Sequence, residues 1–334
     1  MNEQDHDGPS VLRYLSAADV QRCLPPLERR LELAEAALVS LAQGEAQMPP
    51  KPVLEPRPEA FFHPMAAWLR RQDLLGIKWV SGYASNFERG LPFVMGLIVL
   101  NDPDTGRPLC VMDCTVLTAV RTADVTGVAL KRFAKKGDRL VTIVGAGVQG
   151  RSHLPVFARC LDNPELTVLD RSPERAEAYV EWARQQPGIA AASVATDLAA
   201  GLADADVVLT AGTAHGFGGR FVEPGVVRPN CLLIPIDWNL MVSPETACAA
   251  AWLVVDDRDE FEYYRFHDSD ENFLGFPPAH ETIGEAVARG ADPESRPSGL
   301  VVVCPLGAAV VDVMLASDVY SRACELGVGA VLPL

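Results

Sequence analysis

A regular alternation of apolar and helical segments, beginning at Leu140, constrains the fold more than any other feature of this chain. Runs such as LVTIV (140–144), CLLIPID (231–237) and WLVVDD (252–257) are separated by segments with helical spacing, for example PERAEAYVEWARQQ. Strands that are apolar along their whole length are typical of a parallel sheet covered by helices on both faces. The sequence therefore predicts an α/β fold with a Rossmann-like, doubly wound parallel sheet.

The chain before this alternation has a different pattern. A helix is expected over residues 27–44, followed by short strand-like pieces, a hairpin turn at DPDTGRP and a second helix from Thr115. Residues 260–297 are polar, aromatic and proline-rich, and they predict loops with one short helix at ETIGEAVARG. A long amphipathic helix then ends near Gly327. At 334 residues the chain is long enough for two domains, the first of them α+β.

A glycine motif, GAGVQG at residues 145–150, follows the strand LVTIV and opens a helix. In this context Gly145 permits a tight turn, Gly147 lets the backbone approach a pyrophosphate, and Gly150 allows close packing of helix on strand. Asp170 ends the next strand, where a carboxylate accepts hydrogen bonds from ribose hydroxyls. These features predict a dinucleotide site that favours NAD. NADP remains open, because Arg171 and Arg175 could accommodate a phosphate.

Asp237 ends the apolar run LLIPID, at the carboxyl end of a predicted parallel strand. Ligands of doubly wound folds bind at this edge of the sheet. A carboxylate there could exchange a proton with a substrate amine beside the nicotinamide. The alternative is an acid that caps a helix or lies in a loop.

Three cations, Lys51, Lys78 and Arg121, are embedded in apolar surroundings, where an unpaired charge is costly. A substrate α-carboxylate would neutralise them, with Arg121 binding it through two hydrogen bonds and Lys78 either pairing with it or donating a proton. The alternative is that each reaches water or pairs with Asp113 or Glu55.

Composition excludes several other functions. With 29 basic and 44 acidic residues the net charge is −15, which argues against nucleic acid or an anionic membrane as a partner. The eight cysteines form no CxxC pair, so no disulfide scaffold and no metal site are expected. No apolar run is long enough to cross a bilayer, and the first residues, MNEQDHDGPS, lack the pattern of a secretory signal. We therefore expect a cytoplasmic protein.

Taken in order, several segments resemble the ornithine cyclodeaminase/mu-crystallin family over nearly the whole chain. They are PPKPVL, GIKWVSGYASN, VLNDPDTGRPLCVMD, TAVRTADVTG, VGAGVQG, IPID and PLGAAVVDVMLA. The resemblance implies a substrate-binding and dimerisation domain over residues 1–130, an NAD-binding domain over 131–304, and a C-terminal helix within 305–334 that returns to the first domain. It also implies a homodimer that acts on a small amino acid, imino acid or 2-oxo acid.

The resemblance assigns roles to individual residues. Asp237 matches the catalytic acid, Lys78 and Arg121 match residues that bind the substrate carboxylate, and Lys51 matches a position that is often Arg. Lys78 is also expected to take part in catalysis, and Gly307 to bind substrate. The residues expected to contact the cofactor are Thr122, Gly145, Gly147, Val148, Gln149, Asp170, Arg171, Thr210 and Ala211.

One departure from the family pattern guides the choice of activity. Cyclodeaminases carry a second catalytic Glu shortly before the proline that corresponds to Pro64, and this chain has Phe61 and Phe62 there. His63 is either a substitute acid–base group or a structural histidine. The segments look closer to the branch of N-(2-amino-2-carboxyethyl)-glutamate dehydrogenase.

The function expected from the residues and the resemblance together is that of an NAD-dependent amino-acid dehydrogenase or imine reductase. It would interconvert an L-amino acid, N-substituted or not, with its imine or 2-oxo acid by hydride transfer at Cα. The alternative is a cyclodeaminase that releases ammonia from ornithine or lysine with bound NAD. A binding protein without activity is disfavoured, because Asp237 and the three cations are retained.

Overall fold

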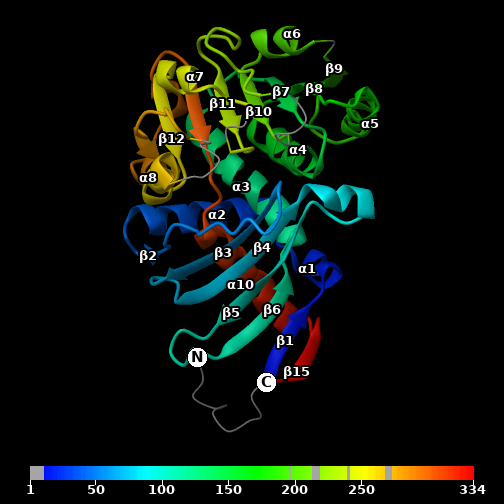
Figure 1. The fold of residues 1–334 in the computed structure, drawn as a ribbon, viewed down its shortest axis with the longest axis vertical. Coiled ribbons are helices and arrows are strands. Elements are labelled where there is room, and N and C mark those ends of the chain that lie inside the picture. Colours follow the sequence, from blue (N-terminus) through cyan, green and yellow to red (C-terminus); the bar gives the residue numbers. More distant parts are fainter. Residues whose placement is uncertain (1–10, 196, 213–218, 239–240, 268–272) are drawn as a thin grey trace. The chain divides into compact units, whose positions relative to one another are not determined.

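The computed structural model describes residues 11–195, 197–212, 219–238, 241–267 and 273–334. The chain forms two compact units (Figure 1). The first comprises Met1–Pro26, Glu45–Thr118 and Ala309–Leu334, and the second comprises Leu27–Gly44 and Ala119–Ala308. The N-terminal stretch MNEQDHDGPS, used above to argue against a secretory signal, lies outside the described residues.

In the described part of the chain, the second unit holds an eight-stranded parallel sheet with the strand order β13-β12-β14-β11-β10-β7-β8-β9. Its central strands β10, β11 and β14 are buried along their whole length. The predicted Rossmann-like sheet is thereby confirmed. The strands are β7 (Leu140–Val144), β8 (Glu165–Leu169), β9 (Ala191–Val194), β10 (Val207–Thr210), β11 (Leu232–Pro235), β12 (Trp252–Val255), β13 (Glu281–Thr282) and β14 (Val301–Cys304).

The second unit also contains helices, of which α3 begins in the first unit. They are α2 (Leu27–Ala42), α3 (Thr115–Phe133), α4 (Val148–Cys160), α5 (Pro173–Ala183), α6 (Leu198–Ala203), α7 (Pro244–Ala249), α8 (Arg258–His267) and α9 (Ile283–Ala288), with a short 3-10 helix at Pro293–Ser295. The expectation of loops with one short helix over 260–297 was wrong at its start, where α8 forms. Phe261 and Tyr264 share a buried side of α8, so packing stabilises a helix that the polar residues had obscured. Residues 268–272 of this segment lie outside the described residues.

The boundary between the units differs from the one expected at residue 130. Helix α2 belongs to the second unit, because it packs against α9. The approach is close at Gly284, where an added Cβ would lie 2.1 Å from the carbonyl oxygen of Leu38. The division also falls inside α3, after Thr118.

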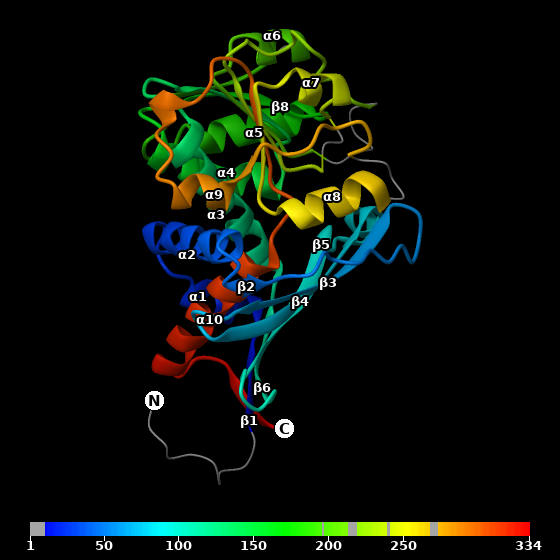
Figure 2. The same cartoon turned by 90° about the vertical axis from the view of Figure 1, so that its left-hand side faces the viewer.

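The first unit is an α+β fold in which helices pack on a sheet (Figure 2). Its sheet has the order β15-β1-β6-β5-β4-β3-β2 and is antiparallel except where β1 pairs with β6. Helix α10 lies against strands β3, β4 and β5, and α1 packs on α10. The elements are β1 (Val11–Leu15), α1 (Ala17–Cys23), β2 (Ala46–Gln47), β3 (Ala60–Leu69), β4 (Leu74–Tyr83), a 3-10 helix (Ala84–Arg89), β5 (Val94–Asn101), β6 (Pro108–Asp113), α10 (Ala309–Glu325) and β15 (Ala330–Pro333).

Local sequence signals explain several of these boundaries. Ser16 and Asp19 form a capping box at the start of α1. Gly327 follows α10 with φ +63°, the left-handed conformation typical of a residue just past a helix end. None of the described helices combines the length and the apolar composition needed to cross a bilayer. The cytoplasmic location expected from the sequence stays a prediction.

Candidate active site

The strand order gathers the expected site residues of the second unit at one edge of its sheet. Strand β10 lies between β7 and β11, with Thr210 opposite Val144 on one side and Pro235 on the other. The strands are parallel, so their carboxyl ends meet at the same edge. The glycine turn after β7 and the acid after β11 therefore flank the end of β10, where Thr210 and Ala211 lie.

Close approaches within the protein require glycine at two of the three glycine positions of the motif. Gly145 has φ +112°, and a Cβ there would lie 2.6 Å from the carbonyl oxygen of Ala211. A Cβ at Gly150 would lie 2.3 Å from the carbonyl oxygen of Gly145, so the helix packs tightly on the turn. Gly147 is open by comparison, because the nearest atom to its Cβ position is an Arg175 nitrogen at 3.5 Å. This openness lets a ligand approach the backbone.

The first turn of α4 suits a dinucleotide. Gly147 is its N-cap residue, and no side chain caps the helix there, so the helix N-terminus can receive an anion. Gln149 Oε1 and Thr210 Oγ1 are buried with no hydrogen-bond partner among the described residues. Buried polar atoms in native proteins nearly always have partners, and a bound ligand is one source of them. Val148, the first residue of α4, is 69% exposed. The residues present therefore fit a dinucleotide.

Asp170 follows β8 and is hydrogen-bonded to the glycine turn. Its Oδ2 accepts a hydrogen bond from the Ala146 N–H at 2.8 Å, and its Oδ1 accepts one from the Ser172 N–H at 3.0 Å. Two carboxylate oxygens can accept about four hydrogen bonds, so capacity for ribose hydroxyls remains. The neighbouring Arg171 is exposed.

Asp237 is buried, with 7% of its surface exposed, directly after β11. It caps no described helix, because α7 is the next one and Ser243 caps it. Its neighbour Trp238 has φ +61°, a strained conformation for a bulky residue, and its indole packs edge-on against the Tyr264 ring with 4.9 Å between centroids. Trp238 anchors the chain just after the acid. We missed this role in the sequence, although the Asp-Trp pair is visible there.

Arg121 on α3 is buried and lies against Gly307. Gly307 has φ +101°, and a Cβ there would be 3.1 Å from Arg121 Nη1, so this position admits glycine and excludes larger residues. Asp256, which follows β12, holds the loop by accepting N–H hydrogen bonds from Leu306, Gly307 and Ala308 at 2.7–3.1 Å. We missed Asp256 in the sequence. Thr122, the next residue of α3, is half-buried.

Lys78 of β4, in the first unit, is paired with Asp312 of α10. Lys78 Nζ lies 3.1 Å from Asp312 Oδ1, and the two side chains are 1% and 0% exposed. Sequence reasoning offered Asp113 or Glu55 as partners and did not name Asp312, with which the structure pairs Lys78. Asp113 instead accepts a hydrogen bond from the Thr115 N–H at the start of α3. Asp312 escaped notice because it is the one acid in the apolar run AAVVDVMLA.

Lys51 and His63 are also buried in this unit. His63 lies on the same face of β3 as Met65, the partner of Lys78, and its Nδ1–H donates to the carbonyl oxygen of Pro52 at 3.1 Å. Burial, followed by the positive charges of Lys51 and Lys78, lowers the pKa of His63 to about 4. His63 is therefore a neutral imidazole at neutral pH.

Comparison with known proteins shows which family the chain matches. Residues 14–233 match the model of the ornithine cyclodeaminase/mu-crystallin family. The nodulation efficiency protein NfeD of Rhizobium meliloti is 31% identical over 329 residues, which cover 96% of this chain and 98% of that protein.

Two solved structures share the fold over almost the full length. Delta(1)-pyrroline-2-carboxylate reductase of Thermococcus litoralis, in complex with NADH and L-proline, is 27% identical with a TM-score of 0.82, and the match covers 95% of this chain and 99% of that one. An archaeal alanine dehydrogenase dimer with bound NAD is 28% identical with a TM-score of 0.84, and the match covers 96% of this chain and 99% of that one.

Proposed function

Because the chain belongs to the ornithine cyclodeaminase/mu-crystallin family, we propose that it is an NAD-dependent oxidoreductase acting on an L-amino acid. It interconverts the amino acid, N-substituted or not, with its imine or 2-oxo acid. The observation that carries the proposal is the shared sheet edge, where Asp237 and the dinucleotide turn flank Thr210. The related structures that hold NADH with L-proline, and NAD, support the same chemistry.

Different residues of the chain bind different parts of the cofactor. The glycine turn and the first turn of α4 bind the pyrophosphate, and Asp170 accepts hydrogen bonds from ribose hydroxyls. The buried side-chain oxygens of Gln149 and Thr210 form hydrogen bonds with the cofactor. Thr122, Val148, Arg171 and Ala211 make further contacts with it. The bound nicotinamide supplies or accepts the hydride.

Substrate binding and proton transfer fall to the buried charged residues. Arg121 binds the α-carboxylate through two parallel N–H bonds, and Gly307 leaves room for the guanidinium. Lys51 and Lys78 contribute further positive charge. Lys78, held by Asp312, acts as a hydrogen-bond donor in this assignment. Asp237 exchanges the proton at the substrate nitrogen as that nitrogen changes between amine and imine.

Cofactor consumption tests the proposal. Purified protein is given NADH and a series of 2-oxo acids, each with and without ammonia or an amino acid as the amine. We expect the nicotinamide absorbance to fall when acid and amine are both present. Ammonia release from ornithine or lysine without net cofactor change would identify a cyclodeaminase instead. The placement near N-(2-amino-2-carboxyethyl)-glutamate dehydrogenase stays a prediction, which the choice of acid and amine would decide.

Gly307→Ala should weaken substrate binding selectively. The added methyl group would collide with the Arg121 guanidinium, so we expect KM for the carboxylate substrate to rise about tenfold or more, the equivalent of one displaced charged hydrogen bond. The matched control is Gly290→Ala, since Gly290 also has a positive φ, +65°, but has no atom within 4 Å of its Cβ position. Equal KM values for the two variants would contradict the assignment of Arg121.

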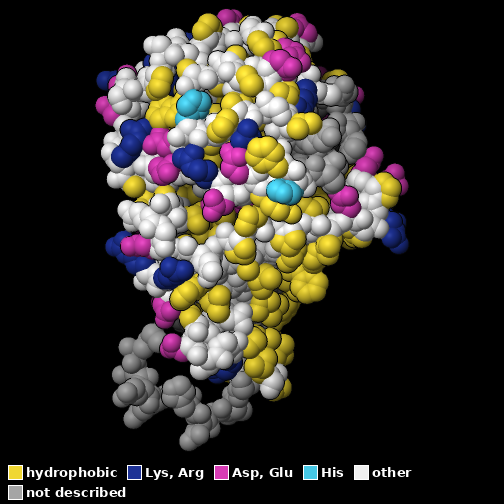
Figure 3. Space-filling view, turned by 60° about the vertical axis from the view of Figure 1, so that its left-hand side comes forward, with side chains coloured by type: hydrophobic (Ala, Val, Ile, Leu, Met, Phe, Trp, Pro, Cys, Tyr) yellow, Lys and Arg dark blue, Asp and Glu magenta, His cyan; other side chains and the backbone are white. Residues whose placement is uncertain are grey.

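We also propose a homodimer formed through the outer face of the first unit's sheet, the face opposite α10. Tyr14, Trp68, Trp79 and Leu97 lie on it and are 36–57% exposed. Figure 3 shows hydrophobic side chains gathered over the part of the molecule that this sheet occupies. Exposed apolar patches of this kind mark interaction surfaces, and the related alanine dehydrogenase is a dimer.

Trp79→Glu should convert the dimer to monomer, because the substitution would bury a charge at the centre of the proposed interface. Light scattering during gel filtration would measure the mass. The control is Phe266→Glu, which places the same charge at a 71% exposed aromatic position on α8. A wild-type monomer, or a dimer that persists in the Trp79 variant, would rule out this interface.

A further inference from the structure

Phe61 lies on the same face of the first unit's sheet as Lys78. In the register of β3 and β4, Lys78 lies opposite Met65, and further along the two strands Phe61 lies opposite Gly82. Alternate residues of a strand share a face, and directly paired residues point to the same side, so Phe61, His63 and Met65 project on the side of Lys78. The Phe61 ring occupies the space above Gly82, where an added Cβ would lie 2.3 Å from Phe61 Cε1.

Ring contacts extend from His63 through Phe61 to two further phenylalanines. The ring centroids of His63 and Phe61 are 4.9 Å apart. Phe93 packs edge-on against Phe61 with 6.2 Å between centroids, and Phe87 stacks on Phe93 at 5.9 Å. We call Phe61, Phe93 and Phe87 the aromatic row. All three belong to the first unit.

This side of strands β3, β4 and β5 carries no charge beyond Lys78. Its described residues from there to the ends of the strands are His63 and Phe61 on β3, Val80 and Gly82 on β4, and Gly96 and Val94 on β5. His63 is neutral at neutral pH, because burial lowers its pKa to about 4. A charged group would lose water here without gaining an ionic partner, whereas an apolar group would be stabilised by burial against the rings.

The residues assigned to the substrate carboxylate lie next to the aromatic row. Burial, followed by the positive charges of Lys51 and Lys78, lowers the pKa of His63, so both cations act on this imidazole. Phe61 contacts the same imidazole from the other end of the row. In an α-amino acid the carboxylate and the side chain are bonded to one carbon. A substrate whose carboxylate is held by these lysines therefore reaches Phe61 with its side chain.

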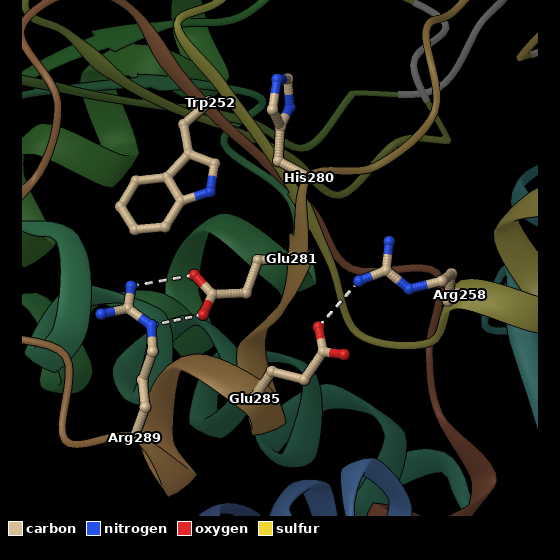
Figure 4. Close-up of a pocket in the computed structure, with 6 residues that line it drawn as sticks. All are labelled: Trp252, Arg258, His280, Glu281, Glu285 and Arg289. Atoms are coloured by element: carbon tan, nitrogen blue, oxygen red, sulfur yellow. Dashed lines mark hydrogen bonds and ion pairs between the residues drawn. The ribbon is translucent and has the colours of Figure 1, made fainter.

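A pocket of about 440 Å³ in the second unit has the opposite character (Figure 4). Arg258 Nη2 lies 2.8 Å from Glu285 Oε2, and Arg289 donates to both carboxylate oxygens of Glu281 at 2.5 and 3.0 Å. Each arginine of this pocket is thus paired with a glutamate. The pocket does not compete with the lysines of the first unit for a substrate carboxylate.

We propose that Phe61 and Phe93 form a subsite for an apolar substrate side chain, so that the protein prefers amino acids of the size of leucine or phenylalanine. Phe61 is the residue that determines this specificity. The inference rests on the proposed function and deepens it by naming the substrate class. A glutamate-type substrate, as in the branch to which the sequence looks closest, would need a cation in place of the aromatic row.

A series of 2-oxo acids tests the subsite on the wild type. Each acid is offered with NADH and ammonia, and kcat/KM is measured for 4-methyl-2-oxopentanoate, pyruvate and 2-oxoglutarate. We expect the first to exceed both others about tenfold or more, because a single methylene in an apolar pocket already changes kcat/KM by about tenfold or more. Preference for pyruvate or 2-oxoglutarate would overturn the subsite alone. Absence of cofactor oxidation with every acid and amine would overturn the proposed function itself.

Two variants of nearly equal size test Phe61. Phe61→Met keeps an apolar side chain, and Phe61→Gln replaces it with a polar one. The readout is the ratio of kcat/KM for 4-methyl-2-oxopentanoate to that for pyruvate, which cancels any general loss of activity. This ratio should stay within about threefold of the wild type in Phe61→Met and fall about tenfold or more in Phe61→Gln.

The matched control is Phe62→Gln. Phe62 points to the opposite face, where its ring packs edge-on against Trp79 with 5.3 Å between centroids. The ratio should therefore be unchanged in this variant. Equal ratios in Phe61→Met and Phe61→Gln, or an equal fall in Phe61→Gln and Phe62→Gln, would refute the role of Phe61.

Discussion

Asp237→Asn should abolish turnover while leaving cofactor affinity nearly unchanged. The amide has the shape of the carboxylate but cannot exchange a proton with the substrate nitrogen, so kcat should fall by about 10²–10⁴, the usual worth of a general acid or base. The NADH Kd should stay within about twofold of the wild-type value. The loss of one hydrogen bond to a charged group would change Kd by much more than that. Steady-state kinetics and NADH titration measure the two quantities.

The control for this variant is Asp204→Asn, which makes the same chemical change at an exposed acid after α6. It should leave kcat as in the wild type. If the Asp237 variant kept more than about a tenth of wild-type kcat, the loss would be below the range expected for a general acid or base, and Asp237 would not be the proton-exchanging group.

The second large effect concerns stability. Lys78→Met should lower the free energy of unfolding by about 3–5 kcal/mol, because it leaves the fully buried Asp312 carboxylate without its ion-pair partner. The double variant Lys78→Met/Asp312→Leu should recover most of that loss, since an apolar pair can replace a buried ion pair. Activity should remain low in both variants, because Lys78 is assigned to the substrate. Urea unfolding and kinetics separate the two roles.

An exposed ion pair of the same unit provides the comparison. Arg71 and Glu45 lie 3.5 Å apart with side chains 68% and 39% exposed, so Arg71→Met should cost less than about 1 kcal/mol. If Lys78→Met lowered the free energy of unfolding by a similarly small amount, Asp312 would not carry a buried charge. Recovery of activity in the double variant would refute the role of Lys78 in substrate binding.

The dinucleotide half of the fold could be predicted because its signals are local. The glycine motif, the apolar strands and the acid after β8 are short patterns whose geometry follows from backbone constraints. Parallel pairing then places Asp237 at the edge with the glycine turn. Strands β1 and β15 were not predicted, since they pair with each other from opposite ends of the chain.

The partners of buried charges could not be predicted, because tertiary packing selects them. Asp312 and Lys78 are 234 residues apart. Asp237 and Asp256 look alike in sequence, each ending an apolar strand, yet Asp256 accepts N–H bonds from the 306–308 loop and so supports Arg121 through Gly307. The neutral state of His63 likewise depends on burial beside Lys51. In each case, contacts distant in sequence decide the role.

Hydride transfer at Cα is the central claim, and isotope transfer tests it most directly. The protein is incubated with cofactor deuterated at the transferred position, the active 2-oxo acid and its amine, and the amino-acid product is analysed by mass spectrometry. We predict one deuterium at Cα for each reduced cofactor consumed. Product without cofactor-derived deuterium at Cα would contradict the account.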